Sequence, residues 1–132
     1  MFHLLSAYGS TEIGGSTMMA QNDLCFGKSG IPIEGVKFYL DDWHEGGYSV
    51  NDKPNPRGEL VVSGRSVALG YYKKPEETAK DFIVDEEGCR WFRSGDIGEI
   101  FPDGTLKIID RKKDLVKLSN GEFISLGKVC NR

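Results

Sequence analysis

The 132-residue sequence predicts an α+β fold that is mostly β, and three observations support this prediction. Its 17 glycines are spread along the whole chain, which predicts many turns separated by short strands. Several segments alternate between apolar and polar residues, as strands with one buried face do. A clear helix signal is present in one segment. We therefore expect a β-rich meander with one helix and a single core, for which this length suffices.

The predicted elements follow one another with distinct boundaries. Residues 35–42 form a strand, since every second residue is apolar, and residues 45–58 form a long polar loop rich in Gly, Pro, Asn and Asp. Residues 59–64 form a second, β-rich strand. Residues 73–82 form the helix, because a proline and two glutamates suit its first turn. Residues 97–110 form a hairpin around a Pro-Asp-Gly turn.

Composition excludes several classes of protein. The formal net charge of -3 argues against a nucleic-acid-binding protein. No run of about 20 apolar residues and no signal peptide is present, so we expect a soluble, intracellular chain. The three cysteines are widely spaced and the two histidines isolated, which indicates neither a disulfide framework nor a zinc site.

Residues 8–12, with the sequence YGSTE, are the first candidate site. Gly9 lets backbone N–H groups approach a phosphate, and Glu12 can ligate Mg²⁺, a hard cation that prefers carboxylate oxygen. Tyr8 can stack on a base. The alternative interpretation is a turn in which Thr11 caps a short helix.

Two further segments carry polar residues suited to a nucleotide. In residues 91–98, Asp96 follows Ser-Gly on a tight turn and can accept two hydrogen bonds from a ribose diol. Otherwise it is a turn aspartate bonded to nearby backbone. Residues 108–122 place four basic residues around two aspartates, which suits phosphate or ribose contacts and equally suits a solvated turn.

The order and spacing of these motifs resemble those of the adenylate-forming enzymes, which include acyl-CoA synthetases, luciferases and peptide-synthetase adenylation domains. The resemblance is carried by YGSTE, GYY with PEET, WFRSGDIG and DGTLKIIDRKKDLVKLSNGE. The segments PNPRGEL and DRKKDLVKLSNGEFISLGKV resemble the animal-type long-chain fatty acid–CoA ligases, in the branch that prefers polyunsaturated chains. Departures are Ser94 in place of threonine, Ser10 where leucine is common, Ala7 in place of glycine, and the last three residues.

The resemblance implies a reaction in two steps. ATP and a long-chain fatty acid give an acyl-adenylate and pyrophosphate, with Mg²⁺ offsetting phosphate charge. The thiol of CoA then attacks the acyl carbon and releases AMP, after a small C-terminal domain has swung about a hinge. The implied cofactors and partners are therefore ATP or AMP, Mg²⁺, CoA and a long-chain fatty acid, with no nucleic acid.

Residue by residue, the resemblance implies catalytic roles for Thr11, at the α-phosphate, and Glu12, as the Mg²⁺ ligand. It implies that Tyr8 packs against adenine. Asp96 and Arg111 match the residues that hold the ribose.

The resemblance also assigns the parts of the chain. Residues 1–109 match the C-terminal part of the large AMP-binding domain, with a β-barrel-like subdomain preceded by loops up to Gly35. Residues 110–132 match the hinge, at Asp110, and the first strands of a truncated small α+β domain. In that domain Lys117 and Gly121 match a loop that faces the pantetheine channel.

Two pieces of the family's active site have no counterpart in this sequence: the Ser/Thr/Gly-rich triphosphate loop ending in Lys-Gly, and the lysine expected to drive adenylation. We therefore expect the isolated chain to be inactive, and poorly stable because strands without partners expose edges. The parent protein is expected on the cytoplasmic face of the endoplasmic reticulum, mitochondrial outer or peroxisomal membrane, anchored through regions outside this chain. The alternatives are a non-catalytic nucleotide-binding module, a structural domain with remnant motifs, and an enzyme that adenylates an aryl or amino acid.

Overall fold

A computed structural model of the chain describes residues 5–19, 27–118 and 123–125. These residues form ten strands in three antiparallel groups, one α-helix, α1 (Pro75–Asp81), and two short 3₁₀ helices, η1 (His44–Gly46) and η2 (Lys112–Asp114). The prediction of a mostly-β fold with one helix is confirmed. In the part of the chain that the structure describes, no helix combines the length and apolar character needed to cross a membrane.

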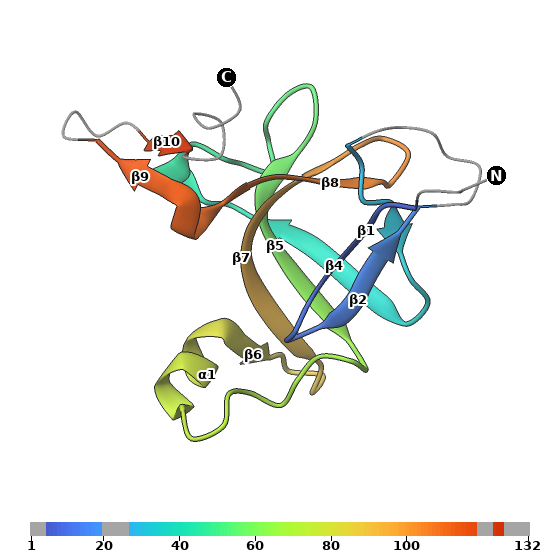
Figure 1. Cartoon of the computed structure of the whole chain (residues 1–132), viewed down its shortest axis with the longest axis vertical. Helices are drawn as coiled ribbons and strands as arrows, with labels where there is room; N and C mark the ends of the chain where they lie inside the picture. The colour runs from blue at the N-terminus through green and yellow to red at the C-terminus, as the bar shows by residue number, and fades with distance from the viewer. Residues whose placement is uncertain (1–4, 20–26, 119–122, 126–132) are drawn as a thin grey trace.

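The main sheet contains β4 (Val36–Asp41), β5 (Arg57–Gly64), β6 (Phe82–Val84), β7 (Arg90–Ile100) and β8 (Leu106–Arg111). Figure 1 shows the long, curved strand β7 crossing the centre of the molecule. It pairs with β5 along most of its length, with β6 at its beginning and with β8 at its end. Strand β7 therefore connects otherwise separate parts of the fold.

Local sequence signals account for several of these elements. In β4 the alternation is confirmed, since Leu40 is buried and Tyr39 is exposed. Helix α1 begins at Pro75, with two glutamates in its first turn, as predicted. The predicted hairpin joins β7 to β8, and the carboxylate of Asp103 accepts hydrogen bonds from both the backbone N–H and the hydroxyl of Thr105.

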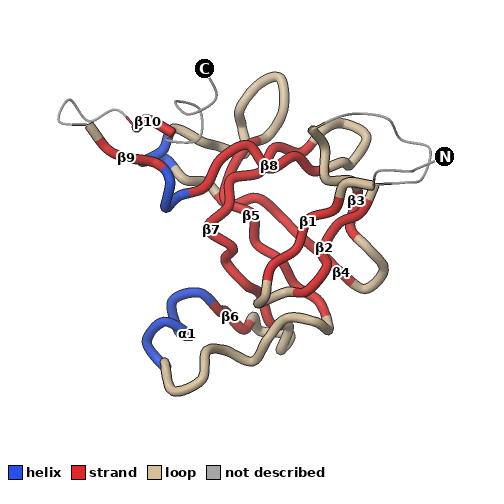
Figure 2. Tube along the Cα trace, viewed as in Figure 1, coloured by secondary structure: helices blue, strands red, loops and turns tan. Residues whose placement is uncertain are grey.

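The segment before Gly35 differs from the expectation of loops. It contains β1 (Ala7–Ser10), β2 (Gly14–Met18) and β3 (Ile31–Pro32), which form an antiparallel sheet in the order β1-β2-β3 (Figure 2). At the turn between β1 and β2, Ile13 is 1% exposed and packs into the core of the main sheet. The hairpin thus gains apolar burial that its short, glycine-rich strands do not reveal in the sequence.

The last described strands, β9 (Leu115–Lys117) and β10 (Phe123–Ser125), form a separate antiparallel pair. Among the described residues, Phe123 and Ser125 make contacts that attach this pair to the rest of the fold. The rings of Phe123 and Trp43 meet edge to face with centroids 5.5 Å apart, and the Ser125 hydroxyl donates to Asp110 Oδ1 at 2.8 Å. Strand β8 runs through Asp110, and the domain boundary after residue 109 stays a prediction.

Candidate functional site

A cleft of about 400 Å³ lies beside the middle of β7. Four segments far apart in the sequence line it: the β1–β2 turn, the region around α1, the strand β7 with part of β5, and the residues from the end of β8 into η2. Its acidic lining residues are Glu12, Glu59, Asp81 and Asp96. Its basic lining residues are Lys80, Arg93, Arg111, Lys112 and Lys113. The basic residues suit an anionic ligand.

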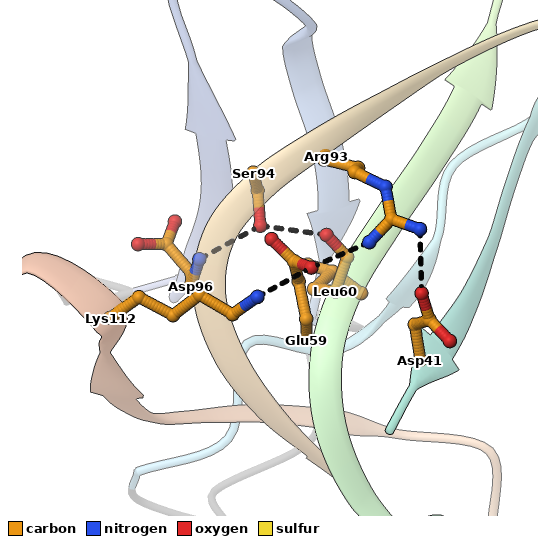
Figure 3. A network of polar contacts seen from close by, with 7 residues as sticks. All are labelled: Asp41, Glu59, Leu60, Arg93, Ser94, Asp96 and Lys112. Atoms are coloured by element: carbon orange, nitrogen blue, oxygen red, sulfur yellow. Dashed lines mark hydrogen bonds and ion pairs between the residues drawn. The ribbon is translucent and has the colours of Figure 1, made fainter. Parts of the chain in front are cut away.

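Asp96 lies within β7, and the prediction of a tight turn at this position is wrong. The neighbouring Gly95 has φ 71°, a left-handed conformation that glycine adopts readily, and the β7–β8 register shifts between Ile97 and Gly98. The Ser94 hydroxyl accepts from the Asp96 backbone N–H at 3.1 Å and donates to a β5 carbonyl at 2.8 Å (Figure 3). In place of the expected turn, the strand has a local break in its regular pairing, which the hydrogen bonds of Ser94 hold in place.

The Asp96 carboxylate is held from two sides. The Tyr8 hydroxyl donates to Oδ2 at 2.6 Å, and Arg111 Nε donates to Oδ1 at 2.9 Å. The Asp96 side chain is 11% exposed, whereas that of Arg111 is 59% exposed. Burial and then the bond to Asp96 raise the pKa of Tyr8 above its usual range, so its hydroxyl stays a donor. Since a carboxylate has about four lone-pair sites, Asp96 can accept further hydrogen bonds from a ligand.

Tyr8 and Thr11 are not among the residues that line the cleft. The partly buried ring of Tyr8 packs against the core, and its contact with adenine stays a prediction. Thr11 is exposed in the turn between β1 and β2, where no helix follows it to be capped. Its phosphate contact also stays a prediction.

Glu12 lies in the cleft with both carboxylate oxygens engaged. The Ser10 hydroxyl donates to Oε2 at 2.9 Å, and the Tyr71 hydroxyl lies 3.1 Å from Oε1. Burial acts to raise the pKa of Glu12, but the hydrogen bonds, Ser10 first, outweigh it and lower that pKa. Among the described residues no group of three or more His, Cys, Asp or Glu side chains could hold a metal ion. Glu12 presents a carboxylate at the wall of the cleft.

Glu59, which the sequence interpretation missed, forms the centre of an ionic network (Figure 3). Its Oε2 accepts from Arg93 Nη1 at 2.9 Å and from Lys112 Nζ at 2.7 Å, while Arg93 also pairs with Asp41. The Glu59 residue is 4% exposed. The signal available in the sequence was an acidic residue in an otherwise apolar strand. Glu59 holds two cations at the cleft wall.

The remaining predicted residues lie away from the cleft or outside the described residues. Asp110 accepts from the Tyr48 hydroxyl at 3.1 Å and from Ser125. Burial and then Asp110 raise the pKa of Tyr48 to about 12. Lys117 is exposed on β9, with its Nζ 5.6 Å from the ring centroid of Phe123. Gly121 lies outside the described residues.

The sequence profile described as "AMP-binding enzyme" matches residues 1–72. Over 123 residues the chain is 51% identical to Long chain acyl-CoA synthetase 8 of Arabidopsis thaliana, covering 92% of this chain and 17% of that protein. Over 132 residues it is 42% identical to Long-chain-fatty-acid–CoA ligase 1 of Schizosaccharomyces pombe, covering 98% of this chain and 19% of that protein. The chain thus spans less than a fifth of the length of these curated relatives.

Solved structures with a similar fold bind adenine nucleotides. One is the A domain of a carboxylic acid reductase from Segniliparus rugosus, in complex with AMP and a co-purified carboxylic acid. It aligns with a TM-score of 0.76 and 36% identity, over 96% of this chain and 18% of that chain. Another is ATP-bound MatB from Rhodopseudomonas palustris, with a TM-score of 0.73 and 29% identity, over 96% of this chain and 24% of that chain.

Proposed function

Because the chain belongs to the AMP-binding enzyme family, we propose that it forms part of an ATP-dependent long-chain fatty acid–CoA ligase. In that protein it supplies the ribose contact, one Mg²⁺ ligand and the segment about which the small domain turns. The acid is a long-chain fatty acid, since the similar curated proteins carry this activity in their names.

One observation carries the nucleotide part of the proposal: the Asp96 carboxylate is oriented at the cleft by Tyr8 and Arg111. Its free lone pairs accept the two hydroxyls of a ribose, as charge-assisted hydrogen bonds worth about 1.5–3 kcal/mol each. Arg111 is exposed enough to contact the ribose as well. The basic residues along the cleft stabilise the phosphate charge.

Glu12 fits a magnesium ion that arrives with the nucleotide. Mg²⁺ keeps several waters and is commonly bound through one or two carboxylates plus substrate phosphates, so a single ordered carboxylate suffices. When bound, the ion neutralises developing charge on the phosphates. Thr11, one residue earlier in the same exposed turn, contacts the α-phosphate.

The second half-reaction uses the C-terminal residues. Asp110 is the hinge, and Lys117 and Gly121 face the pantetheine arm of CoA after the small domain has turned. The division of the chain into residues 1–109 and 110–132 belongs to this proposal. The parent protein acts at the endoplasmic reticulum, mitochondrial outer or peroxisomal membrane through segments outside this chain.

A chimera tests the assignment to fatty acid ligases. The chain replaces the matching segment of the Schizosaccharomyces pombe ligase, to which it aligns over 132 residues. We expect the chimera to form the CoA thioester from oleate and ATP, and to reject benzoate and phenylalanine. A folded chimera that forms no oleoyl-CoA, beside an active host ligase, would contradict the assignment.

Nucleotide binding by the chain itself distinguishes a functional nucleotide site from a structural domain that only retains the family's motifs. Isothermal titration of the chain with millimolar AMP is expected to give measurable heat with a single site. Pyrophosphate release by the same chain from ATP and oleate is expected to stay at background. Absence of binding heat at 5–10 mM AMP, an order-of-magnitude range for weak sites, would contradict the nucleotide role.

A further inference from the structure

Tyr71 lines the cleft, and the proposed function gives it no role. Its hydroxyl lies 3.1 Å from Glu12 Oε1 and 3.3 Å from Asp81 Oδ2. Because the hydroxyl carries one hydrogen, the two carboxylates share this donor. The Ser10 hydroxyl occupies the other oxygen of Glu12 at 2.9 Å. The Glu12 carboxylate is therefore held at both ends.

The ring of Tyr71 is itself held rigidly. It packs edge to face against Phe82, with centroids 5.4 Å apart, and Phe82 packs against Phe92 at 5.0 Å. Both phenylalanines are buried in the core, at 7% and 4% exposure. The Tyr71 backbone N–H donates to Thr78 Oγ1 of α1 at 2.9 Å. The position of the hydroxyl is thus determined by the core and by the helix.

Gly70 lets the chain make this approach. Its φ is 145°, and a Cβ at this position would overlap the Thr78 side chain. A residue with a side chain would push the loop away from α1. The glycine therefore allows Tyr71 to bond to Thr78 and face Glu12 at the same time.

The same loop is bonded to the turn that carries Glu12. The Ala68 backbone N–H donates to the Glu12 carbonyl at 2.8 Å, and the Ser66 hydroxyl donates to the Ile13 carbonyl at 2.6 Å. Main-chain and side-chain contacts thus fix the distance between Tyr71 and Glu12. The Tyr71–Glu12 hydrogen bond is therefore one of several contacts between this loop and the β1–β2 turn.

We propose that Tyr71 is a positioning residue that holds the Glu12 carboxylate ready for a divalent cation bound with the nucleotide phosphates. This inference rests on the proposed function. A free glutamate loses side-chain entropy when it is fixed in one conformation, and a glutamate that is already held does not lose it again on binding the ion. Residues that orient metal ligands typically change metal affinity by about 10–100-fold when mutated.

Tyr71→Phe tests the inference, with Tyr72→Phe as the matched control. Phenylalanine keeps the ring packing and removes only the hydroxyl, while Tyr72 is 85% exposed and serves as the adjacent tyrosine. The full chain is titrated with Mn²⁺ in the presence of ATP, and bound Mn²⁺ is measured by electron paramagnetic resonance. We expect about 10-fold weaker Mn²⁺ binding for Tyr71→Phe and no change for Tyr72→Phe.

Metal-free AMP binding separates positioning from a purely structural role. In EDTA, Tyr71→Phe should bind AMP as the wild type does, because the ribose contact at Asp96 does not involve Tyr71. Equal losses of AMP and Mn²⁺ binding would overturn the inference, as would unchanged Mn²⁺ binding. In the ligase chimera the same variant should raise the Mg²⁺ concentration at half-maximal rate, with the KM for oleate unchanged.

A second variant keeps the test decisive if Tyr71→Phe does not fold. Ser10→Ala removes the donor on the other oxygen of Glu12, and it should weaken Mn²⁺ binding in the same direction. If wild-type chain binds no AMP, the proposed function itself fails. If wild type binds AMP and both variants bind Mn²⁺ as it does, only the inference about Tyr71 fails.

Discussion

Replacing Asp96 with asparagine removes the negative charge at the proposed ribose contact and changes the shape of the side chain little. The amide oxygen can still accept from Tyr8, but the amide nitrogen cannot accept a ribose hydroxyl. One charge-assisted ligand hydrogen bond is lost and the other becomes neutral, which together costs about 3 kcal/mol. We therefore expect Asp96→Asn to weaken AMP binding by about 150-fold.

The same substitution also affects the free chain. The 2.6 Å bond from Tyr8 loses its charge assistance, at a cost of about 1 kcal/mol. The pair with Arg111 contributes less, about 0.5 kcal/mol, because the Arg111 side chain is 59% exposed. We expect unfolding in urea to report a total loss of about 1–2 kcal/mol.

Isothermal titration distinguishes the ribose contact from general destabilisation. Asp103→Asn is the control, since Asp103 also accepts bonds from Lys28 and Thr105 but does not line the cleft. It should lose stability and retain the wild-type Kd for AMP. With 2′,3′-dideoxy-AMP, wild type and Asp96→Asn should bind equally. An undiminished difference with the dideoxy nucleotide would refute a ribose contact at Asp96.

Three further predictions concern stability. Glu59→Gln removes the charge shared by Arg93 and Lys112. Because Arg93 keeps Asp41 and both cations are partly exposed, the free energy of unfolding in urea should fall by about 1–2 kcal/mol; a loss below about 0.5 kcal/mol would show that the network is dispensable. Gly58→Ala places a Cβ against a β4 carbonyl oxygen and should lower the free energy of unfolding in urea by about 1–3 kcal/mol. Gly15→Ala is the control, since its Cβ would lie 3.8 Å from its nearest neighbour, and it should lower that free energy clearly less. Because burial and Asp110 raise the pKa of Tyr48 to about 12, the folded chain keeps a proton that the unfolded chain loses near pH 10. Stability should consequently fall as the pH rises from about 10 to 12, and thermal melts of Tyr48→Phe should lack this part of the decline.

Elements with local causes could be predicted from the sequence. Helix α1 depends on Pro75 and on the two glutamates that follow it, which lie in one turn. The β7–β8 hairpin depends on a turn whose Asp103 and Thr105 bond to each other. In β4 the alternation of burial is a direct result of strand geometry. Each of these signals lies within a few residues of the element it specifies.

The geometry of the site could not be predicted because its partners are distant in the sequence. Tyr8 and Asp96 are 88 residues apart, and Glu59 bonds to cations 34 and 53 residues away. Motif order identified Asp96 and Glu12 as candidates. It did not indicate that the hydroxyl of Tyr8 faces Asp96, or that Tyr71 faces Glu12. Such contacts follow from strand pairing, which a single sequence does not specify.

The first three strands, β1 to β3, also depend on residues distant in the sequence, so the sequence did not predict them. Strand β3 has two residues and β2 is rich in small residues, so neither has a recognisable alternation. Their pairing is stabilised by Ile13, which reaches the core of a sheet built from later residues. The expectation of loops failed because burial, and not local propensity, determines this segment.

The bond between Tyr8 and Asp96 has a consequence for how the chain folds. It closes a loop of 88 residues, and because closing so long a loop costs conformational entropy, we expect it to form late in folding, with the pairing of the main sheet. The ribose site proposed at Asp96 is therefore expected only once the chain is folded, and a nascent chain that still lacks Asp96 cannot form it. Nucleotide should consequently slow unfolding and leave the refolding rate nearly unchanged, as expected for contacts made after the folding transition state.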